Sequence, residues 1–133
     1  MLSLPASVRV YVAAGPVDMR MGHHGLAAVV QNSLQLDPVA GHLFLFTNRR
    51  GNLMKLLWFD RSGYAMLFKR LERGTFQLPR VPDGAARVQV DLATLAMILE
   101  GIDLHRAVRR PRYRHPDRDA AQKPDGQIVF EIS

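Results

Sequence analysis

Three short apolar segments separated by polar turns dominate the middle of the chain. They span His42–Thr47, Leu53–Phe59 and Tyr64–Leu71. The breaks between them read NRRGN (48–52) and DRSG (60–63), which are rich in turn-forming residues. Apolar segments of this length between Asn/Gly and Asp/Gly turns are typical of consecutive antiparallel strands. Because no uninterrupted apolar pattern here is long enough for a helix, the sequence predicts a three-stranded meander.

The second hairpin of this meander has a testable register. If residues 59 and 64 face each other across the DRSG turn, Met54 pairs with Lys69. Side chains alternate between the two faces of a strand, so Lys69 lies on the face of Met54 and Lys55 on the opposite face. The two lysines are therefore not expected to form one continuous basic face.

One strand and one helix are predicted before the meander. Ser7–Ala13 alternates valines with Arg and Tyr, which predicts a half-buried strand. Met21–Leu34 has apolar residues at helical spacing and predicts a first helix. Asp18 precedes that helix and is predicted to cap it, because a carboxylate can accept hydrogen bonds from the free amides of a first turn.

A second strand and helix are predicted after the meander. Arg87–Val90 predicts a short strand. Asp91 is expected to cap a helix over Leu92–Glu100, and Gly101 to end it. The apolar residues of this helix form a broad face, so we expect it to pack on the sheet.

The composition changes from Asp103 onward. Residues 105–127 contain almost nothing that could enter a core, and they predict a basic, mostly disordered arm. Ile128–Ile132 alternates again and can pair with a sheet edge or with a neighbouring molecule. The predicted fold is therefore a single α+β domain over residues 1–104. In it, a mainly antiparallel sheet with a central meander is packed by two helices, and residues 105–133 form the arm.

The composition narrows the protein class. A chain of 133 residues with 47% apolar residues is expected to form one globular domain with one core. No apolar run approaches the length of a membrane span. The absence of cysteine excludes disulfides and thiol-based metal sites or nucleophiles. These features fit a reducing cytoplasm, with no membrane partner and no cofactor, and they leave the oligomeric state open.

Positive charge is concentrated in one region. The formal net charge of the chain is +6, and its pI is about 10.5. Residues 49–80 hold eight basic residues against two acids, whereas residues 1–48 are balanced. Residues 81–101 carry −2 and residues 102–133 carry +2. A basic surface favours an acidic partner, with nucleic acid the leading candidate, although basic surfaces also serve solubility.

Two groups of basic residues in the meander are candidates for DNA contact. Arg49 and Arg50 lie at the tip of the first hairpin, where guanidinium groups can reach phosphate oxygens bidentately. A second candidate group comprises Lys55, Lys69, Arg70 and Arg73, of which Lys69, Arg70 and Arg73 are the predicted DNA contacts. The alternative for both groups is that they lie in a solvated turn and at a sheet edge, where their charges prevent aggregation through the apolar strands.

The arm contributes a third candidate group. Six arginines and a tyrosine lie between residues 106 and 118, a composition found in nucleic-acid-binding arms and also in solubilising tails. The arginines that we consider are Arg109, Arg110, Arg112 and Arg114.

Aromatic residues of the meander have two interpretations. Trp58, Tyr64 and Phe68 could stack on nucleic-acid bases, as aromatics do on single-strand-binding sheets. Large aromatics on strands more often fill the core, and we predict that role for these three.

No constellation of catalytic or metal-binding residues emerges. The acids mostly occupy cap and turn positions, and there is no phosphate-binding Gly-rich loop and no nucleophile motif. Without cysteine, a zinc site would need His23 or His24 together with remote carboxylates or His42. We therefore predict no enzyme and no metal site.

Several stretches in a fixed order resemble a known family. They are VDMR (17–20), the block 41–76 that contains the three apolar segments and their two turns, and LAMILEGIDL (95–104). Together they are similar to the accessory protein of the insertion sequence sixty-six family, often called TnpB or the second open reading frame and unrelated to the RNA-guided nuclease of that name. The resemblance runs from about residue 4 to residue 104. Phe59 stands where a second Trp is expected.

The resemblance implies an accessory factor for transposition, encoded beside a larger transposase that carries the catalytic acids. It implies no active site in this chain. Two functions are consistent with it: a DNA-contacting factor that uses the basic hairpin surface and assists the transposase, and a protein–protein adaptor that docks the transposase without binding DNA. An enzyme, as a third hypothesis, requires metal-dependent turnover that is lost on mutating one carboxylate.

Overall fold

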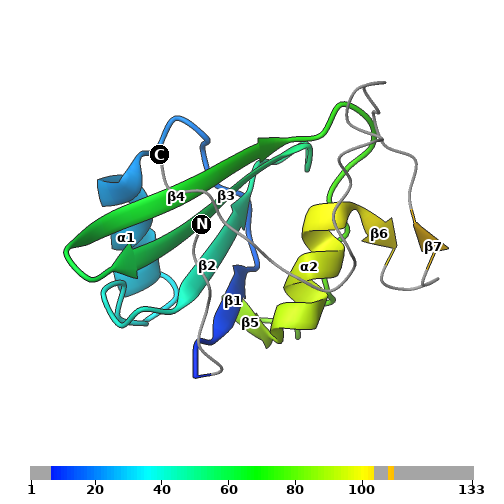
Figure 1. The fold of residues 1–133 in the computed structure, drawn as a ribbon. Coiled ribbons are helices and arrows are strands. Elements are labelled where there is room, and N and C mark those ends of the chain that lie inside the picture. Colours follow the sequence, from blue (N-terminus) through cyan, green and yellow to red (C-terminus); the bar gives the residue numbers. More distant parts are fainter. Residues whose placement is uncertain (1–6, 104–107, 110–133) are drawn as a thin grey trace.

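The computed structural model describes the backbone of residues 7–103 and 108–109 and the side chains of residues 7–101. Up to the second helix, strands and helices follow one another in the predicted order, and two short strands after it were not predicted (Figure 1). The elements are β1 (Val10–Ala13), α1 (His23–Asn32), β2 (Leu43–Thr47), β3 (Leu53–Asp60), β4 (Gly63–Arg70), β5 (Arg87–Val90), α2 (Leu92–Glu100), β6 (Ile102–Asp103) and β7 (Val108–Arg109).

Five strands form one sheet in the order β4-β3-β2-β1-β5. β1 and β2 pair in parallel, and the other pairs are antiparallel. This confirms the predicted α+β class and the mainly antiparallel sheet, with β2, β3 and β4 as the meander. The register of the second hairpin is also confirmed, since Phe59 pairs with Tyr64 and Met54 with Lys69.

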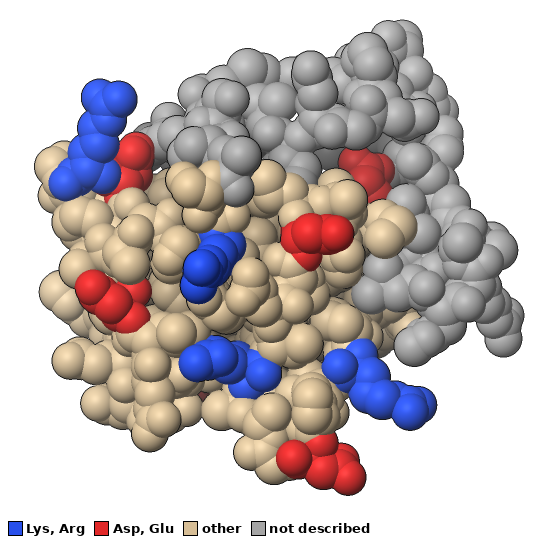
Figure 2. All heavy atoms as spheres, turned by 90° about the horizontal axis from the view of Figure 1, so that it is seen from below, with Lys and Arg blue, Asp and Glu red and all other residues tan. Residues whose placement is uncertain are grey.

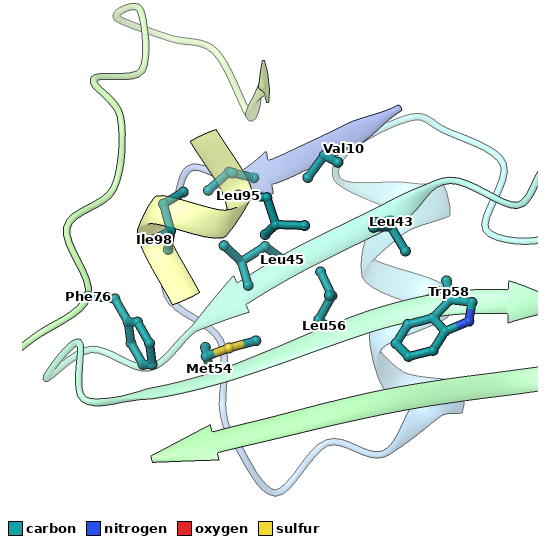
Figure 3. Close-up of a cluster of buried hydrophobic side chains, with 10 residues drawn as sticks. Val10, Leu43, Leu45, Met54, Leu56, Trp58, Phe76, Leu95 and Ile98 are labelled. Carbon is teal, nitrogen blue, oxygen red and sulfur yellow. The ribbon is translucent and has the colours of Figure 1, made fainter. Parts of the chain in front are cut away.

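The two helices cover opposite faces of the sheet (Figure 1). On one face, Leu95 and Ile98 of α2 pack on a buried cluster that includes Leu45 and Leu56 (Figure 3). On the other face, Leu26 and Val30 of α1 join a second buried cluster. The protein therefore has three layers, and strands in the middle of the sheet are buried on both faces.

This layering corrects the prediction of a half-buried first strand. All four residues of β1 are buried, including Tyr11, which is only 6% exposed. β1 lies between β2 and β5, with α2 over one face and α1 over the other. Its alternation of valine and polar residues therefore does not mark a solvent-facing side, because Tyr11 packs on Phe44 in the second cluster.

The predicted cap of the first helix is wrong. The N-cap of α1 is Gly22, which offers no side-chain oxygen. Asp18 instead accepts the Arg20 backbone N–H at 2.9 Å and closes a local turn before the helix. The carboxylate is only two residues from the Arg20 N–H, and such local bonds between side chain and backbone compete with capping of a helix.

Both predicted ends of the second helix are confirmed. Asp91 accepts the Thr94 backbone N–H at 2.7 Å, the geometry of an N-cap. Gly101 ends the helix in the left-handed region with φ 78°, which a glycine adopts without a Cβ clash.

The Asp91 cap makes part of the stability depend on pH. Hydrogen bonds from the Thr94 side chain and backbone lower the pKa of Asp91 below its usual 3.8. A lowered folded-state pKa stabilises the protein above the unfolded-state pKa, and this contribution is lost as pH falls through the folded-state pKa. We therefore expect Asp91→Asn, which can still cap, to lose less stability than the wild type between about pH 4 and pH 2. Urea unfolding midpoints across this range measure the difference, and parallel curves for the two proteins would contradict it.

Part of the predicted arm lies outside the described residues. Within 105–127, the structure describes Val108–Arg109 as β7, which pairs antiparallel with Ile102–Asp103. Ile128–Ile132, proposed as a terminal strand, also lies outside the described part. In the part of the chain that is described, no helix is long and apolar enough to span a membrane.

Candidate nucleic-acid interface

The β2–β3 turn is held by side-chain hydrogen bonds and presents two arginines. Asn48 accepts the Leu53 backbone N–H through Oδ1 at 3.0 Å and donates through Nδ2 to Asn52 Oδ1 at 2.9 Å. Gly51 has φ +77°, so the backbone conformation of the turn favours glycine at this position. Arg49 and Arg50 are both exposed at the tip. The side-chain bonds of Asn48 thus fix the backbone from which these two guanidinium groups extend.

The segment that follows β4 lies against this turn. Leu71 N–H donates to Asn52 O at 2.9 Å, and Phe76 N–H donates to Gly51 O at 2.8 Å. Phe76 is buried and anchors the segment in the cluster below α2. A Cβ on Gly51 would lie 3.3 Å from the Thr75 Cβ, which shows how closely the two backbones approach.

The contact between these segments gathers four exposed arginines at one end of the sheet, the upper right in Figure 1. We call this set the arginine cluster; its members are Arg49, Arg50, Arg70 and Arg73. Glu72 is the acid in the same segment and is also exposed. Four of the predicted contact residues, from two sequence regions twenty residues apart, are therefore brought together.

Sequence reasoning missed a further base near this end. Val17 N–H donates to Thr47 O at 2.9 Å and ties the loop after β1 to the end of β2. Arg20 in this loop has a side chain 92% exposed, and its Nη2 lies 2.7 Å from Asp18 Oδ2. The Arg20 guanidinium lowers the pKa of Asp18 to about 2. In the sequence, Arg20 and Asp18 are two of the charges that sum to zero over residues 1–48. The hydrogen bond between Val17 and Thr47 places them near the hairpin.

Lys69 was proposed to contact DNA, and in the structure it is hydrogen-bonded to the second helix. Its Nζ donates to the backbone carbonyl of Leu99, in the last turn of α2, and the residue is half-buried. A cation there satisfies a free carbonyl and complements the negative end of the helix. The structure thus gives Lys69 a bond within the fold, and its contact with DNA stays a prediction.

Lys55 lies on the opposite face, as predicted. Its Nζ donates to the backbone carbonyls of Met19 and Met21, both at 2.7 Å, and lies 5.7 Å from the centre of the Phe68 ring. One lysine therefore anchors the last turn of α2 and the other anchors the loop before α1.

The core prediction holds for one aromatic residue and fails for another. Trp58 is buried, with 3% of its surface exposed, and belongs to the same buried cluster as Leu95 and Ile98, at the side away from α2 (Figure 3). Tyr64 is half-buried and contacts the cluster under α1. Phe68 is 52% exposed, because β4 is the outer strand and α1 does not reach over its far end.

Charges elsewhere are mixed rather than gathered. Figure 2 shows the molecule from below, where basic and acidic side chains alternate over the described surface. The end of the sheet opposite the arginine cluster carries Arg9 and Arg61 together with Asp60 and Asp91. Arg109 belongs to β7, and the other proposed arm residues, Arg110, Arg112 and Arg114, lie outside the described residues.

The described residues show no arrangement for metal chemistry. Among them, no group of three or more His, Asp or Glu side chains could hold a metal ion. His42, one of the histidines considered as a ligand, accepts the Arg9 backbone N–H through Nδ1 at 3.0 Å.

Comparison with known proteins agrees with the resemblance found in the sequence. The family described as IS66 Orf2 like protein matches residues 8–109. Two proteins of Sinorhizobium fredii (strain NBRC 101917 / NGR234) are similar over most of their length. Uncharacterized protein y4hO is 40% identical over 116 residues, which is 87% of this chain and 91% of the relative. Uncharacterized protein y4jC is 34% identical over 111 residues, or 84% of this chain and 93% of the relative. No solved structure matches. The chain therefore belongs to the IS66 Orf2-like family, whose members are associated with an insertion sequence as accessory proteins.

Proposed function

We propose that this protein is a non-catalytic accessory factor for transposition that contacts DNA through the arginine cluster. The observation that carries the proposal is the pairing of the β2–β3 turn with the segment after β4. It places four exposed guanidinium groups on two backbones that are hydrogen-bonded to each other. Side chains on a rigid support lose less entropy on binding than side chains on a free loop.

The proposed contacts are to phosphate oxygens. Guanidinium groups bind phosphates bidentately, and such contacts hold a protein on a duplex without reading its sequence. Glu72 beside Arg73 opposes a phosphate at that position, so the tip residues Arg49 and Arg50 have the larger expected share. The arginines of the arm, from Arg109 to Arg114, would add affinity to the same strand or to a neighbouring one.

The proposed role follows from the family. In the bacterial cytoplasm, the protein would help to assemble the separate transposase on the ends of the element, with the catalytic acids supplied by that enzyme. A cationic surface without a metal-binding cluster among the described residues fits a factor that positions DNA. No cofactor is needed for this role.

A salt series tests this function. Purified protein is titrated against a fluorescent duplex carrying the element's end and against a scrambled duplex. Binding through four phosphate contacts predicts that log K falls with log salt with a slope of about −3.6. The ratio between the two duplexes separates recognition of the ends from charge attraction alone. Absence of binding to either duplex at low salt would refute direct DNA contact.

The alternative function is a protein–protein adaptor for the transposase. The observation in its favour is apolar surface on β4, where Met66 and Phe68 are 38% and 52% exposed. Docking through apolar surface responds little to salt, in contrast to phosphate contact. A pull-down with the transposase that persists at high salt, together with no DNA binding, would favour the adaptor.

A further inference from the structure

In the described part of the chain, β4 is one edge of the sheet. It is the outermost strand and pairs with β3 over all eight of its residues without a bulge. It contains no proline, and Met66 and Phe68 on one of its faces are exposed. A long, regular edge with exposed apolar side chains is a template for pairing with another strand.

The other edge of the sheet is protected. β5 has four residues. Its first residue, Arg87, donates through Nε to Leu34 O at 2.9 Å, and its guanidinium lies 5.4 Å from the centre of the Tyr11 ring. Short strands and charged residues are the usual means of blocking an edge. Of the two edges, only β4 has the length and the apolar surface for pairing.

The backbone groups on the outer side of β4 belong to its even-numbered residues, and the side chains of residues 66, 68 and 70 among them are exposed. Leu71 N–H donates to Asn52 O, so odd-numbered residues at this end direct their backbone groups toward β3. Strand residues alternate in this respect, so residues 64, 66, 68 and 70 direct theirs outward. No strand of the described part of the chain pairs with them.

We propose that a second copy of this chain pairs with β4 antiparallel, about a two-fold axis at Leu67. In this register Met66 faces the partner's Phe68, and by symmetry Phe68 faces the partner's Met66. A thioether beside an aromatic ring is a favourable contact. Arg70 likewise faces the partner's Tyr64, where a cation can lie over a ring. Such an interface uses the same surface on both copies, as two-fold dimers do.

Other registers of the same two strands fit less well. A shift by one residue places the apolar side chains of the two copies on opposite faces. A shift by two toward the β3–β4 turn brings Arg70 opposite the partner's Ser62, in the turn, and Tyr64 opposite the partner's Phe68, so neither copy's Tyr64 meets a cation. A shift by two in the other direction brings Arg70 opposite the partner's Met66 and leaves Tyr64 without a cation. The register about Leu67 is the one in which all four outward side chains find complementary partners.

Sedimentation velocity of the full chain over a concentration series tests the dimer. We expect the wild type to dimerise and Phe68→Glu, which places two carboxylates in the interface, to raise the dissociation constant about 100-fold. Val39→Glu is the matched control, because Val39 is 49% exposed in the loop between α1 and β2 and should leave the dimer intact. A monomeric wild type, or a dimer that Phe68→Glu does not weaken, would overturn the proposal, and the first outcome would point to another occupant of the edge.

Disulfide trapping tests the register, since the chain has no cysteine of its own. Leu67→Cys places two thiols opposite each other at the two-fold axis, in a pair with Cα atoms about 4.5 Å apart. That separation is within the range of disulfides, so mild oxidation should give a covalent dimer. Ala65→Cys is the control on the same face, where the thiol faces the partner's Lys69 and should not be linked. Linkage at residue 65 and not at 67 would rule out this register. Neither experiment involves DNA, so the dimer and the proposed function can fail separately.

Discussion

Replacing Arg49 and Arg50 together with alanine should weaken binding to duplex DNA roughly 10- to 100-fold at moderate salt. Both side chains are exposed at the tip of the β2–β3 turn, where Asn48 and Gly51 fix the backbone. Losing two phosphate contacts should also reduce the steepness of the salt dependence by about 1.8. Fluorescence anisotropy on a labelled duplex over a salt series measures both quantities.

A control with the same loss of charge separates a local surface from net attraction. Arg9→Ala combined with Arg61→Ala also removes two exposed arginines, but from the opposite end of the sheet. We expect this variant to bind nearly as well as the wild type, with an unchanged salt slope. An equal loss in both variants would show that net charge, and not the arginine cluster, attracts the DNA.

Folding should be unaffected in either variant, which makes the comparison interpretable. Exposed substitutions away from caps and cores usually change stability by no more than about 0.5 kcal/mol. Trp58, the single tryptophan of the chain, is buried and reports unfolding by fluorescence. Equal urea midpoints for the two variants would attribute any difference in DNA binding to the surface alone.

The meander was predictable because local sequence determines it. Turn residues at 48–52 and 60–63 fix where the strands end, and apolar alternation fixes which residues face the same side. The length of the second turn then determines the register, so the Met54–Lys69 pair could be predicted without knowledge of the rest of the fold. The Asp91 cap and the Gly101 end of α2 are likewise local.

The partners of the basic residues were not predictable, because they depend on contacts between distant segments. Lys69 was expected to contact DNA, but its Nζ reaches Leu99 O, thirty residues away in sequence.

The burial of some residues was not predictable either, because it depends on the strand order. Phe68 was expected in the core, but the strand order puts β4 at the edge. The pairing of β1 with β2 in parallel, which buries the first strand on both faces, also has no local sequence signal.

The same distinction applies to the arginine cluster. Arg49 and Arg50 could be identified from the hairpin alone, and Arg70 and Arg73 from their charge. Their proximity depends on hydrogen bonds between residues 51–52 and residues 71 and 76, which no periodicity predicts. The proximity of these four arginines therefore depends on how the β2–β3 turn packs against the segment after β4.

Lys55→Met should destabilise the protein by about 2 to 4 kcal/mol, which is a large fraction of the stability of a domain of this size. The substitution keeps the apolar chain beside Phe68 but removes the two hydrogen bonds to Met19 O and Met21 O. Those carbonyls belong to the loop that crosses from β1 to α1, and a charged donor to a half-buried carbonyl is among the stronger hydrogen bonds in a protein. The free energy of unfolding in urea, followed by Trp58 fluorescence, measures the loss.

A local measurement shows whether the loss has the expected cause. Arg20 lies in the anchored loop with its side chain 92% exposed, so trypsin cleavage after Arg20 reports how firmly the backbone is held. In Lys55→Met this cleavage should accelerate more than cleavage after Arg61, in the β3–β4 turn. Arg80→Met, which removes an exposed charge outside the helices and strands, should leave both stability and cleavage after Arg20 unchanged. If Lys55→Met unfolds within about 0.5 kcal/mol of the wild type, the loop is held by its apolar contacts with α1 and the sheet, and the lysine bonds are incidental.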